Sequence, residues 1–146
     1  MQTSKRLKNQ SAIITGSSKG IGKAIAMEFA KEGANVTINY HSSKEEAEET
    51  AHQLEEQYKD IKVLVLKGDV SKEADVKNIF KKSITEFGTV DICVANAGIQ
   101  KDYLLHEMPL EAWKKVIDVN LTGQFLCAKE ALNVFLKRGL RKEISK

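Results

Sequence analysis

The chain has 146 residues, 42% of them hydrophobic and 29% charged, and a formal net charge of +3 at pH 7. This length and composition predict a soluble globular protein with one domain over residues 1–146. Lysine and arginine are scattered rather than clustered, which argues against a nucleic-acid-binding protein, and no apolar run is long enough to span a bilayer.

The first half of the chain alternates between strand and helix signals. An apolar run predicts a strand at 11–15, and apolar residues at helical spacing predict a helix over 20–32, which Gly33 would end in a left-handed conformation. A second strand is expected at 35–40. The next helix, over 44–57, is expected to open with a Ser-Lys-Glu-Glu capping box and to carry a solvated acidic face.

The second half continues this alternation. A short and almost wholly apolar strand is expected at 61–66, as in a sheet that is covered on both faces. A helix that starts at Ser71 or its neighbour and ends near Phe87 would stop at Gly88. A fourth apolar strand is expected at 90–95, and 109–137 is predicted to be one long helix with a proline in its first turn.

The alternation predicts an α/β fold, a Rossmann-like doubly wound parallel sheet that is truncated after the long helix following the fourth strand. In such a sheet the ligand lies beyond the carboxyl ends of the strands. Four chemically suggestive segments each follow a predicted strand, namely 16–22, 40–42, 68–70 and 96–98. We expect these segments to converge on one edge of the sheet.

The cysteines and the first residues bear on metal binding and location. Cys93 and Cys127 have no short ligand spacing, so neither a zinc site nor a disulfide framework is predicted, and no metal is expected. Both lie in apolar patterns and are expected to be small buried hydrophobes. Residues 1–10 are polar and lack the apolar core of a signal peptide, which favours the cytoplasm.

The segment 15–22 has the sequence Thr-Gly-Ser-Ser-Lys-Gly-Ile-Gly and joins a predicted strand to a predicted helix. Glycines let a backbone turn sharply and approach phosphates, and a helix N-terminus offers unpaired N–H groups and a partial positive charge. The hydroxyls of Ser17 and Ser18 could bond phosphate or ribose. The segment is therefore predicted to bind a dinucleotide, the alternative being an ordinary glycine-rich turn.

Three motifs in this order make the chain resemble the short-chain dehydrogenase/reductase family. The loop at 15–22 matches the family's TGxxxGIG pattern, Asn-Ala-Gly at 96–98 matches its NAG motif, and Asn120 matches its helix asparagine. The resemblance extends over residues 7–136. More narrowly, 39–42 and 106–113 resemble bacterial glucose 1-dehydrogenases, with 3-oxoacyl-carrier-protein reductases somewhat less similar.

This resemblance implies roles for individual residues. Asp69 would accept a hydrogen bond from the adenine amino group and Val70 would pack on the ring, whereas Asn120 would be catalytic and hold a water in the proton relay. Taken alone, Asp69 could equally be a turn or cap residue, and Asn120 a polar residue satisfied within a helix. The other residues implied at the pyrophosphate, the adenosine and its ribose are Gly16, Ser17, Ser18, Lys19, Gly20, Ile21, Gly22, Asn96, Ala97 and Gly98.

The end of the second predicted strand bears on the choice of cofactor. NAD-binding sites usually have a carboxylate there, bonded to the ribose 2′-hydroxyl, but this chain has Tyr40. Lys19, His41 and Ser42 could contact a 2′-phosphate, Lys19 through its charge. NADP is therefore favoured and NAD is possible, unless Lys19 and His41 are simply exposed.

The family's hydride-transfer chemistry uses a tyrosine, a lysine four residues later and a serine, and the resemblance places all three beyond Lys146. The chain is therefore expected to carry the cofactor-binding half and to be inactive alone. Tyr40 with Lys44 and Tyr58 with Lys62 have the required spacing, but they lie on elements that should not reach a nicotinamide.

Three functions remain open at this point. The first is an NADP-dependent oxidoreductase acting on an alcohol or carbonyl, glucose 1-dehydrogenase-like, with sugar and acyl substrates both open. The second is a non-catalytic nucleotide-binding module or truncated remnant, and the third an unrelated doubly wound regulatory domain. The resemblance also implies a homo-oligomer. In the truncated chain the fourth strand would be an unpaired edge, which invites association or aggregation. The long helix would also lose some cover at Val116, Val119, Phe125, Leu126, Leu132 and Phe135.

Overall fold

A computed structural model describes residues 5–142 and contains one parallel sheet. The strands β1 (Ser11–Ile14), β2 (Asn35–Tyr40), β3 (Val63–Lys67) and β4 (Ile92–Val94) lie in the order β3-β2-β1-β4. Every pairing in this sheet is parallel. The predicted doubly wound α/β fold is therefore confirmed, and β4 is an edge strand paired only with β1 in the described part of the chain.

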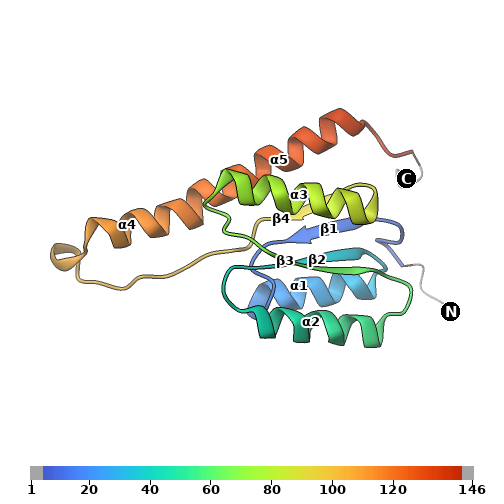
Figure 1. Cartoon of the computed structure of the whole chain (residues 1–146), viewed down its shortest axis with the longest axis horizontal. Coiled ribbons are helices and arrows are strands. Elements are labelled where there is room, and N and C mark those ends of the chain that lie inside the picture. Colours follow the sequence, from blue (N-terminus) through green and yellow to red (C-terminus); the bar gives the residue numbers. More distant parts are fainter. Residues whose placement is uncertain (1–4, 143–146) are drawn as a thin grey trace.

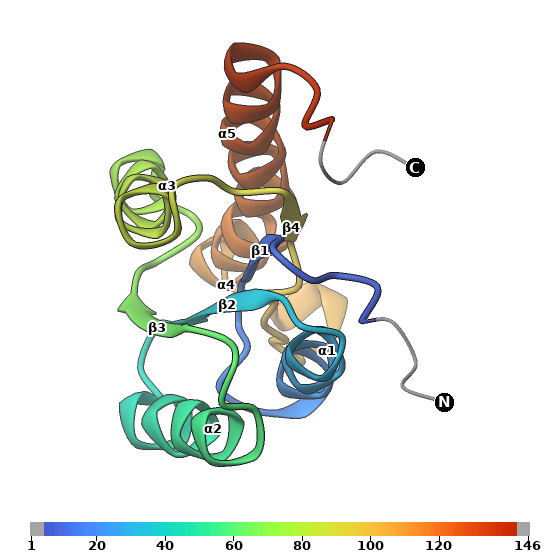
Figure 2. The ribbon, with the colours of Figure 1, turned by 90° about the vertical axis from the view of Figure 1, so that its right-hand side faces the viewer.

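Helices cover both faces of the sheet. The pair α1 (Gly20–Lys31) and α2 (Lys44–Gln57) packs on one face. The pair α3 (Glu73–Phe87) and α5 (Gly123–Arg138) packs on the other, so that the sheet lies between two helical layers (Figures 1 and 2). Each strand must therefore bury both of its sides, which explains its apolar sequence.

Alternate residues of β1 divide the core into two clusters. Ile13 packs into the cluster beneath α3 and α5, whereas Ala12 and Ile14 pack into the cluster beneath α1 and α2. Successive side chains of a strand point to opposite faces, so one short strand contributes to both layers. All three residues are at most 1% exposed.

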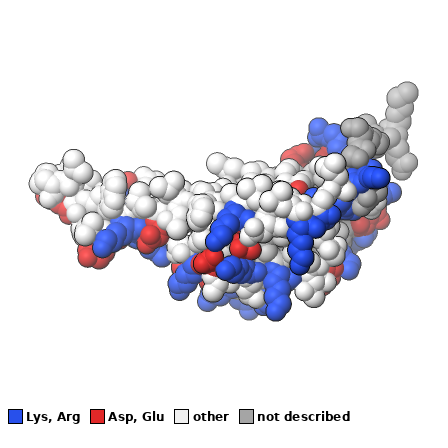
Figure 3. Space-filling model, turned by 90° about the horizontal axis from the view of Figure 1, so that it is seen from above, with Lys and Arg blue, Asp and Glu red and all other residues white. Residues whose placement is uncertain are grey.

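The long helix predicted at 109–137 is present but not uniform. It consists of α4 (Leu110–Ile117), a π-helical turn η2 (Asp118–Thr122) and α5, and it follows a short 3-10 turn, η1 (Leu105–Glu107). In Figure 1, α4 extends well beyond the sheet as an arm. In Figure 3 most of the arm's face seen from above is uncharged, with charged residues along one edge, while lysines, arginines and acidic residues are interspersed over the body.

Burial varies along the arm, by which we mean α4, η2 and α5 together. Val119 and Leu126 are buried, contrary to the expectation that they lose cover, because they pack into the core cluster with α3. Phe125 and Leu132 are 60% and 57% exposed. Among residues 5–142, no helix is both long enough and apolar enough to cross a membrane.

Several element boundaries differ from the prediction. The fourth strand is shorter than expected, and α3 begins at Glu73 rather than at Ser71. Ser71 does not start the helix because its amide and hydroxyl both donate to Asp69 Oδ1, which forms a turn instead. Gly33 and Gly88 have φ of 90° and 84°, so their predicted left-handed conformations are confirmed.

A buried carboxylate joins the amino ends of two strands to the end of α5. Asp91 Oδ2 accepts hydrogen bonds from the Ser11 amide at 2.9 Å and from Arg141 Nη1 at 2.7 Å. Its Oδ1 accepts from Arg138 Nη1 at 2.6 Å, and the Asp91 side chain is only 2% exposed. The pattern of apolar residues gave no sign of this cluster, because one acidic residue before a strand is common.

Replacing Asp91 should therefore destabilise the fold strongly. The variant Asp91→Ala leaves two guanidinium groups and one amide without their carboxylate, which should lower the free energy of unfolding by about 3 kcal/mol. Urea denaturation measures this loss. The control Asp60→Ala removes a carboxylate that is 85% exposed and should cost less than about 0.5 kcal/mol. Equal losses of unfolding free energy in the two variants would contradict the structural role assigned to Asp91.

Cys93 of β4 and Cys127 of α5 lie in the core layer between the sheet and α5. Burial, and to a smaller extent the neighbouring Cys127 thiol, raises the pKa of Cys93 to about 12. Burial raises the pKa of Cys127 to about 11. Since only a thiolate reacts readily, neither residue is suited to nucleophilic chemistry in the folded protein.

These thiols should be nearly inert until the protein unfolds. At pH 8 the thiolate fraction of a group with a pKa of 12 is about one in ten thousand, so labelling by a disulfide reagent should be at least about a hundredfold slower than in denaturant. Thiol absorbance assays with and without guanidinium measure this ratio. Rapid labelling of both cysteines in a protein that keeps its helical circular dichroism would contradict the burial.

Candidate functional site

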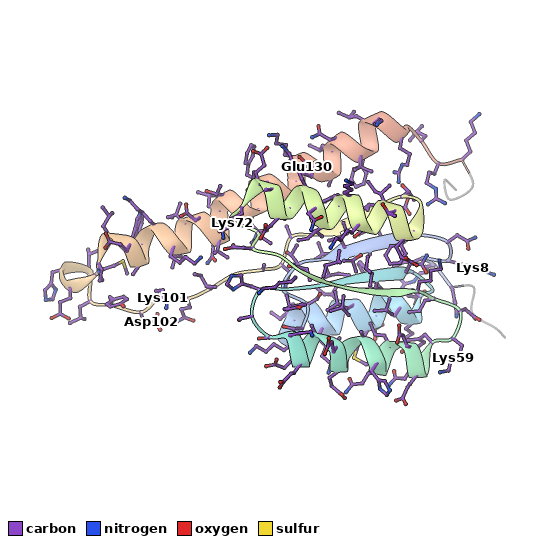
Figure 4. The ribbon with its side chains drawn as sticks, in the orientation of Figure 1. Lys8, Lys59, Lys72, Lys101, Asp102 and Glu130 are labelled. Carbon is purple, nitrogen blue, oxygen red and sulfur yellow. The ribbon has the colours of Figure 1, made fainter. Side chains whose placement is uncertain are left out.

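A cavity of about 300 Å³ lies at the carboxyl ends of the strands. Figure 4 marks the two ends of the sheet, since Lys8 and Lys59 precede β1 and β3 at one end and Lys72 follows β3 at the other. The four segments predicted to converge do so here. Those of their residues that line the cavity are Gly16, Ser18, Lys19, Tyr40, His41, Ser42, Gly68, Asp69, Val70, Asn96, Ala97 and Gly98.

Ser17, Gly20, Ile21 and Gly22 do not line the cavity. The Ser17 hydroxyl is buried, donates to the Ile14 carbonyl at 2.6 Å and accepts from the Asn39 amide at 3.1 Å. It therefore stabilises the loop itself, and of the two predicted serines it is Ser18 that lines the cavity. Ile21 is 75% exposed.

Gly22 allows α1 to approach the loop that precedes it. A Cβ at Gly22 would lie 2.5 Å from the Gly16 carbonyl oxygen and 2.6 Å from Asn96 Nδ2, distances that no side chain tolerates. Gly16 has φ of 61°, and a Cβ there would lie 2.9 Å from the Ala97 Cα. These two glycines are therefore required by close backbone contacts and a left-handed conformation.

The N-terminus of α1 lies at the edge of this cavity. Its N-cap residue is Lys19, no side chain caps it, and its first turn has no acidic residue. By contrast, α2 and α3 each have two acidic residues in their first turns. The free N–H groups and the helix dipole of α1 therefore present a partial positive charge to an anion in the cavity.

Hydrogen bonds lock the glycine loop to the segment after β4. The backbone amides of Asn96 and Ala97 donate to Thr15 Oγ1 at 2.9 and 3.0 Å. In return Asn96 Nδ2 donates to the carbonyls of Thr15 and Gly16 at 2.9 and 3.1 Å. The Asn96 side chain thus holds the loop in shape instead of projecting freely toward a ligand.

Asn39, which the sequence analysis missed, ties the glycine loop to the β2 and β3 side of the cavity. It is 1% exposed, its Oδ1 accepts from the Gly16 amide at 3.2 Å, and its Nδ2 donates to the carbonyls of Leu66 and Gly68 at 3.3 and 3.2 Å. A buried amide satisfied by three backbone groups from two segments is a strong structural constraint. The available signal was an asparagine near the end of an otherwise apolar strand.

Asp69 stabilises its own turn through one carboxylate oxygen and faces two basic side chains through the other. Its Oδ1 accepts from the amide and hydroxyl of Ser71, while its Oδ2 lies 3.7 Å from both Lys115 Nζ and His41 Nε2. Burial alone raises the pKa of Asp69, but the hydrogen bonds from Ser71 and the charges of Lys115 and His41 outweigh it. The pKa therefore lies below its usual value of 3.8, and the group is ionised at neutral pH.

The arm contributes two lining residues that the sequence analysis did not identify. Lys115 of α4 and Val119 of η2 are one helical turn apart and border the cavity opposite the strand ends. Their spacing of four residues puts both on one helix face. The long helix therefore closes one side of the cavity.

The π-helical turn holds the segment after β4 through Asn120. Its Oδ1 accepts from the Ile99 amide and its Nδ2 donates to the Ile99 carbonyl, both at 2.8 Å. Gln124 Nε2 also donates to the Ala97 carbonyl at 2.9 Å. Asn120 itself does not line the cavity, so its side chain acts on the site through Ile99.

Neither accidental tyrosine–lysine spacing forms a pair. Tyr40 borders the cavity, but Lys44 Nζ is held by Glu48 at 3.3 Å. Lys62 Nζ is likewise held by Glu86 at 3.3 Å, and Tyr58 caps the end of α2. Within residues 5–142 there is also no group of three His, Cys, Asp or Glu side chains placed to hold a metal ion.

Comparison with known proteins agrees with this geometry. The family described as short chain dehydrogenase matches residues 10–141. Glucose 1-dehydrogenase 2 of Bacillus subtilis (strain 168) is 45% identical over 138 residues, which are 94% of this chain and 53% of that protein.

Solved structures show the same arrangement of elements. A short chain dehydrogenase from Burkholderia cenocepacia J2315, in complex with NADP, superposes with a TM-score of 0.85 at 30% identity, covering 89% of this chain and 52% of that one. A short-chain type dehydrogenase/reductase from Mycobacterium marinum gives 0.87 at 32% identity, covering 94% and 53%. This chain thus spans about half the length of these relatives. The matched sequence and the shared fold together show that it belongs to the short-chain dehydrogenase family.

Proposed function

We propose that this chain forms the nucleotide-binding part of an NAD(P)-dependent oxidoreductase that acts on an alcohol or carbonyl, as in glucose 1-dehydrogenases. One observation carries the proposal, namely that four strand-end segments and the uncapped N-terminus of α1 surround a single cavity. The similarity to a Bacillus glucose 1-dehydrogenase and to a Burkholderia enzyme in complex with NADP supports it.

The residues around the cavity fit a dinucleotide. Gly16 and Ser18 offer a Cβ-free position and a small polar residue beside the α1 N-terminus, and would hold the pyrophosphate. Asp69 and Val70 would hold the adenine, and the ionised Asp69 carboxylate would accept a hydrogen bond from the adenine amino group. Bound NADP(H) would supply or accept the hydride, and these residues bind and orient it.

NADP is the favoured form, with NAD as a second ligand. Tyr40 ends β2 where an NAD-specific site would have a carboxylate, so no negative charge on that residue repels a 2′-phosphate. Lys19, His41 and Ser42 all line the cavity. The positive charge of Lys19 and the hydrogen-bonding groups of His41 and Ser42 favour binding of a phosphate.

Asn120 is proposed as a residue that positions the segment following β4. Both polar atoms of its amide are engaged with Ile99, which keeps residues 96–99 in place at the cavity wall. The water of the proton relay, which the family resemblance assigns to Asn120, is part of the same proposal. The catalytic tyrosine, lysine and serine would come from outside residues 1–146.

Self-association and a cytoplasmic location complete the proposal. Leu121, Phe125, Leu132 and Leu136 recur at helical spacing along the arm and are 57% to 81% exposed. A continuous apolar stripe on a helix usually marks a protein interface. We propose that a second copy of the protein covers it. Two free cysteines agree with a reducing compartment.

The purified protein should bind NADPH and be stabilised by it. At a free NADPH concentration of 100 times the Kd, the free energy of unfolding should rise by about 2.7 kcal/mol, since ligand binds only the folded state. Calorimetric titration with NADPH and NADH gives the two Kd values, and thermal unfolding gives the stabilisation. Absence of binding to a folded protein would overturn the proposed function.

Two glycine variants separate binding from stability. Gly16→Ala and Gly88→Ala both place a Cβ at positive φ, but only the first puts that Cβ against Ala97 at the cavity. We expect Gly16→Ala to weaken NADPH binding at least about tenfold, because loss of one close phosphate contact costs more than about 1.4 kcal/mol. Gly88→Ala should lower only the unfolding temperature. An equal loss of affinity in both would contradict the site.

The arm should mediate self-association. Sedimentation velocity should show a wild-type oligomer that the double variant Phe125→Glu/Leu132→Glu converts to a monomer, because charges cannot be buried in an apolar interface. The control Leu140→Glu changes a residue that is 93% exposed and lies beyond α5, so it should keep the wild-type size. A wild-type protein that stays monomeric at high concentration would contradict this interface.

A further inference from the structure

An ion pair joins the glycine loop to the first turn of α2. Lys19 Nζ lies 4.0 Å from Glu46 Oε1, and the two side chains are 71% and 51% exposed. Lys19 borders the cavity and is the N-cap of α1, whereas Glu46 is the third residue of α2. A carboxylate is therefore held next to the cation that is best placed to meet a phosphate.

Packing places the turn of α2 that carries Glu46 beside the glycine loop. Thr50, one turn after Glu46, is fully buried and its hydroxyl donates to the Ser18 carbonyl at 2.9 Å. Residues four apart lie on the same helix face, so Glu46 and Thr50 both face the glycine loop. The bond from Thr50 anchors α2 to this loop and keeps Glu46 beside Lys19.

Glu46 differs in this respect from the other acidic residues of α2. The predicted capping box is wrong, because Ser43 makes no capping bond with its side chain, and Glu46 approaches Lys19 instead. Glu48 pairs with Lys44 at 3.3 Å and Glu49 accepts from Gln53 at 2.7 Å, both within α2. Only Glu46 is paired across to the loop.

We propose that Glu46 sets the balance between the two nicotinamide cofactors by opposing the 2′-phosphate. This inference rests on the proposed function, since it assumes that the cavity holds a dinucleotide. NADP differs from NAD by one phosphate, which carries about two negative charges at neutral pH. Glu46 repels that group and also neutralises part of the charge of Lys19 that would attract it, whereas NAD has no 2′-phosphate on which either effect could act. Glu46 therefore weakens NADP binding selectively and keeps NAD competitive.

The other charged groups near this end do not replace Glu46. Asp69 Oδ2 lies 3.7 Å from both His41 Nε2 and Lys115 Nζ, so the charge of Lys115 is balanced by Asp69 and His41 also faces that carboxylate. Lys44 is balanced by Glu48. Tyr40, at the end of β2, brings no carboxylate. The charge that faces Lys19 is thus that of Glu46.

The variant Glu46→Gln tests this role without measuring turnover. Calorimetric titration should show that the ratio of the Kd for NADH to the Kd for NADPH rises about two- to fivefold, the size of effect expected of an exposed ion pair. Most of the change should come from tighter NADPH binding. The shift should shrink at about 0.5 M salt, because exposed charges are screened there.

The matched control is Glu55→Gln, which removes the same charge from an exposed residue in the last turn of α2 and should leave the ratio unchanged. Thermal unfolding establishes that both variants are folded. An equal ratio in wild type and Glu46→Gln, or an equal shift in both variants, would overturn this inference while leaving the proposed function intact. If the wild-type protein binds neither nucleotide, both are overturned.

Discussion

The close approach of α1 to the end of β1 is the constraint on which the cavity depends. Gly22 has no side chain, so the helix can begin within contact distance of the Gly16 carbonyl and of Asn96. That contact allows Asn96 and Thr15 to bond each other's backbone and fixes the loop between strand and helix. With any side chain at position 22 the helix would shift outward, and its N-terminus would no longer border the cavity.

Parallel strands explain why one edge of the sheet gathers all of the chemistry. Each strand ends at the same edge, so the residues that follow β1, β2, β3 and β4 become neighbours although they are far apart in the chain. Asn39 and Asp69 show how these neighbours then support one another. Asn39 joins the glycine loop to the end of β3, and Asp69 both shapes its own turn and attracts cations from two other elements.

The elements and the edge at which they converge could be predicted because they depend on local patterns: apolar spacing, glycine punctuation and strand–helix alternation. What could not be predicted depends on partners distant in sequence. The direction of the Ser17 hydroxyl follows from the buried Ile14 carbonyl, and Lys115 reaches the site only because the arm lies across it. Glu46 has the spacing of a capping residue, yet Ser43 makes no side-chain capping bond and the Glu46 carboxylate lies 4.0 Å from Lys19 Nζ. The bonds between Asn120 and Ile99 likewise join residues far apart in the chain, which no periodicity reveals.

The π-helical turn η2 belongs both to the arm and to the wall of the cavity. Val119 lines the cavity, Asn120 holds the cavity wall through Ile99, and Leu121 faces outward on the same turn. In the proposed assembly, a partner packed on the outer side would restrict the motion of the inner side, and a nucleotide that orders the inner side would favour one geometry of the outer side. The proposed assembly and the proposed nucleotide binding would then be thermodynamically linked, and by reciprocity each would change the other by the same factor.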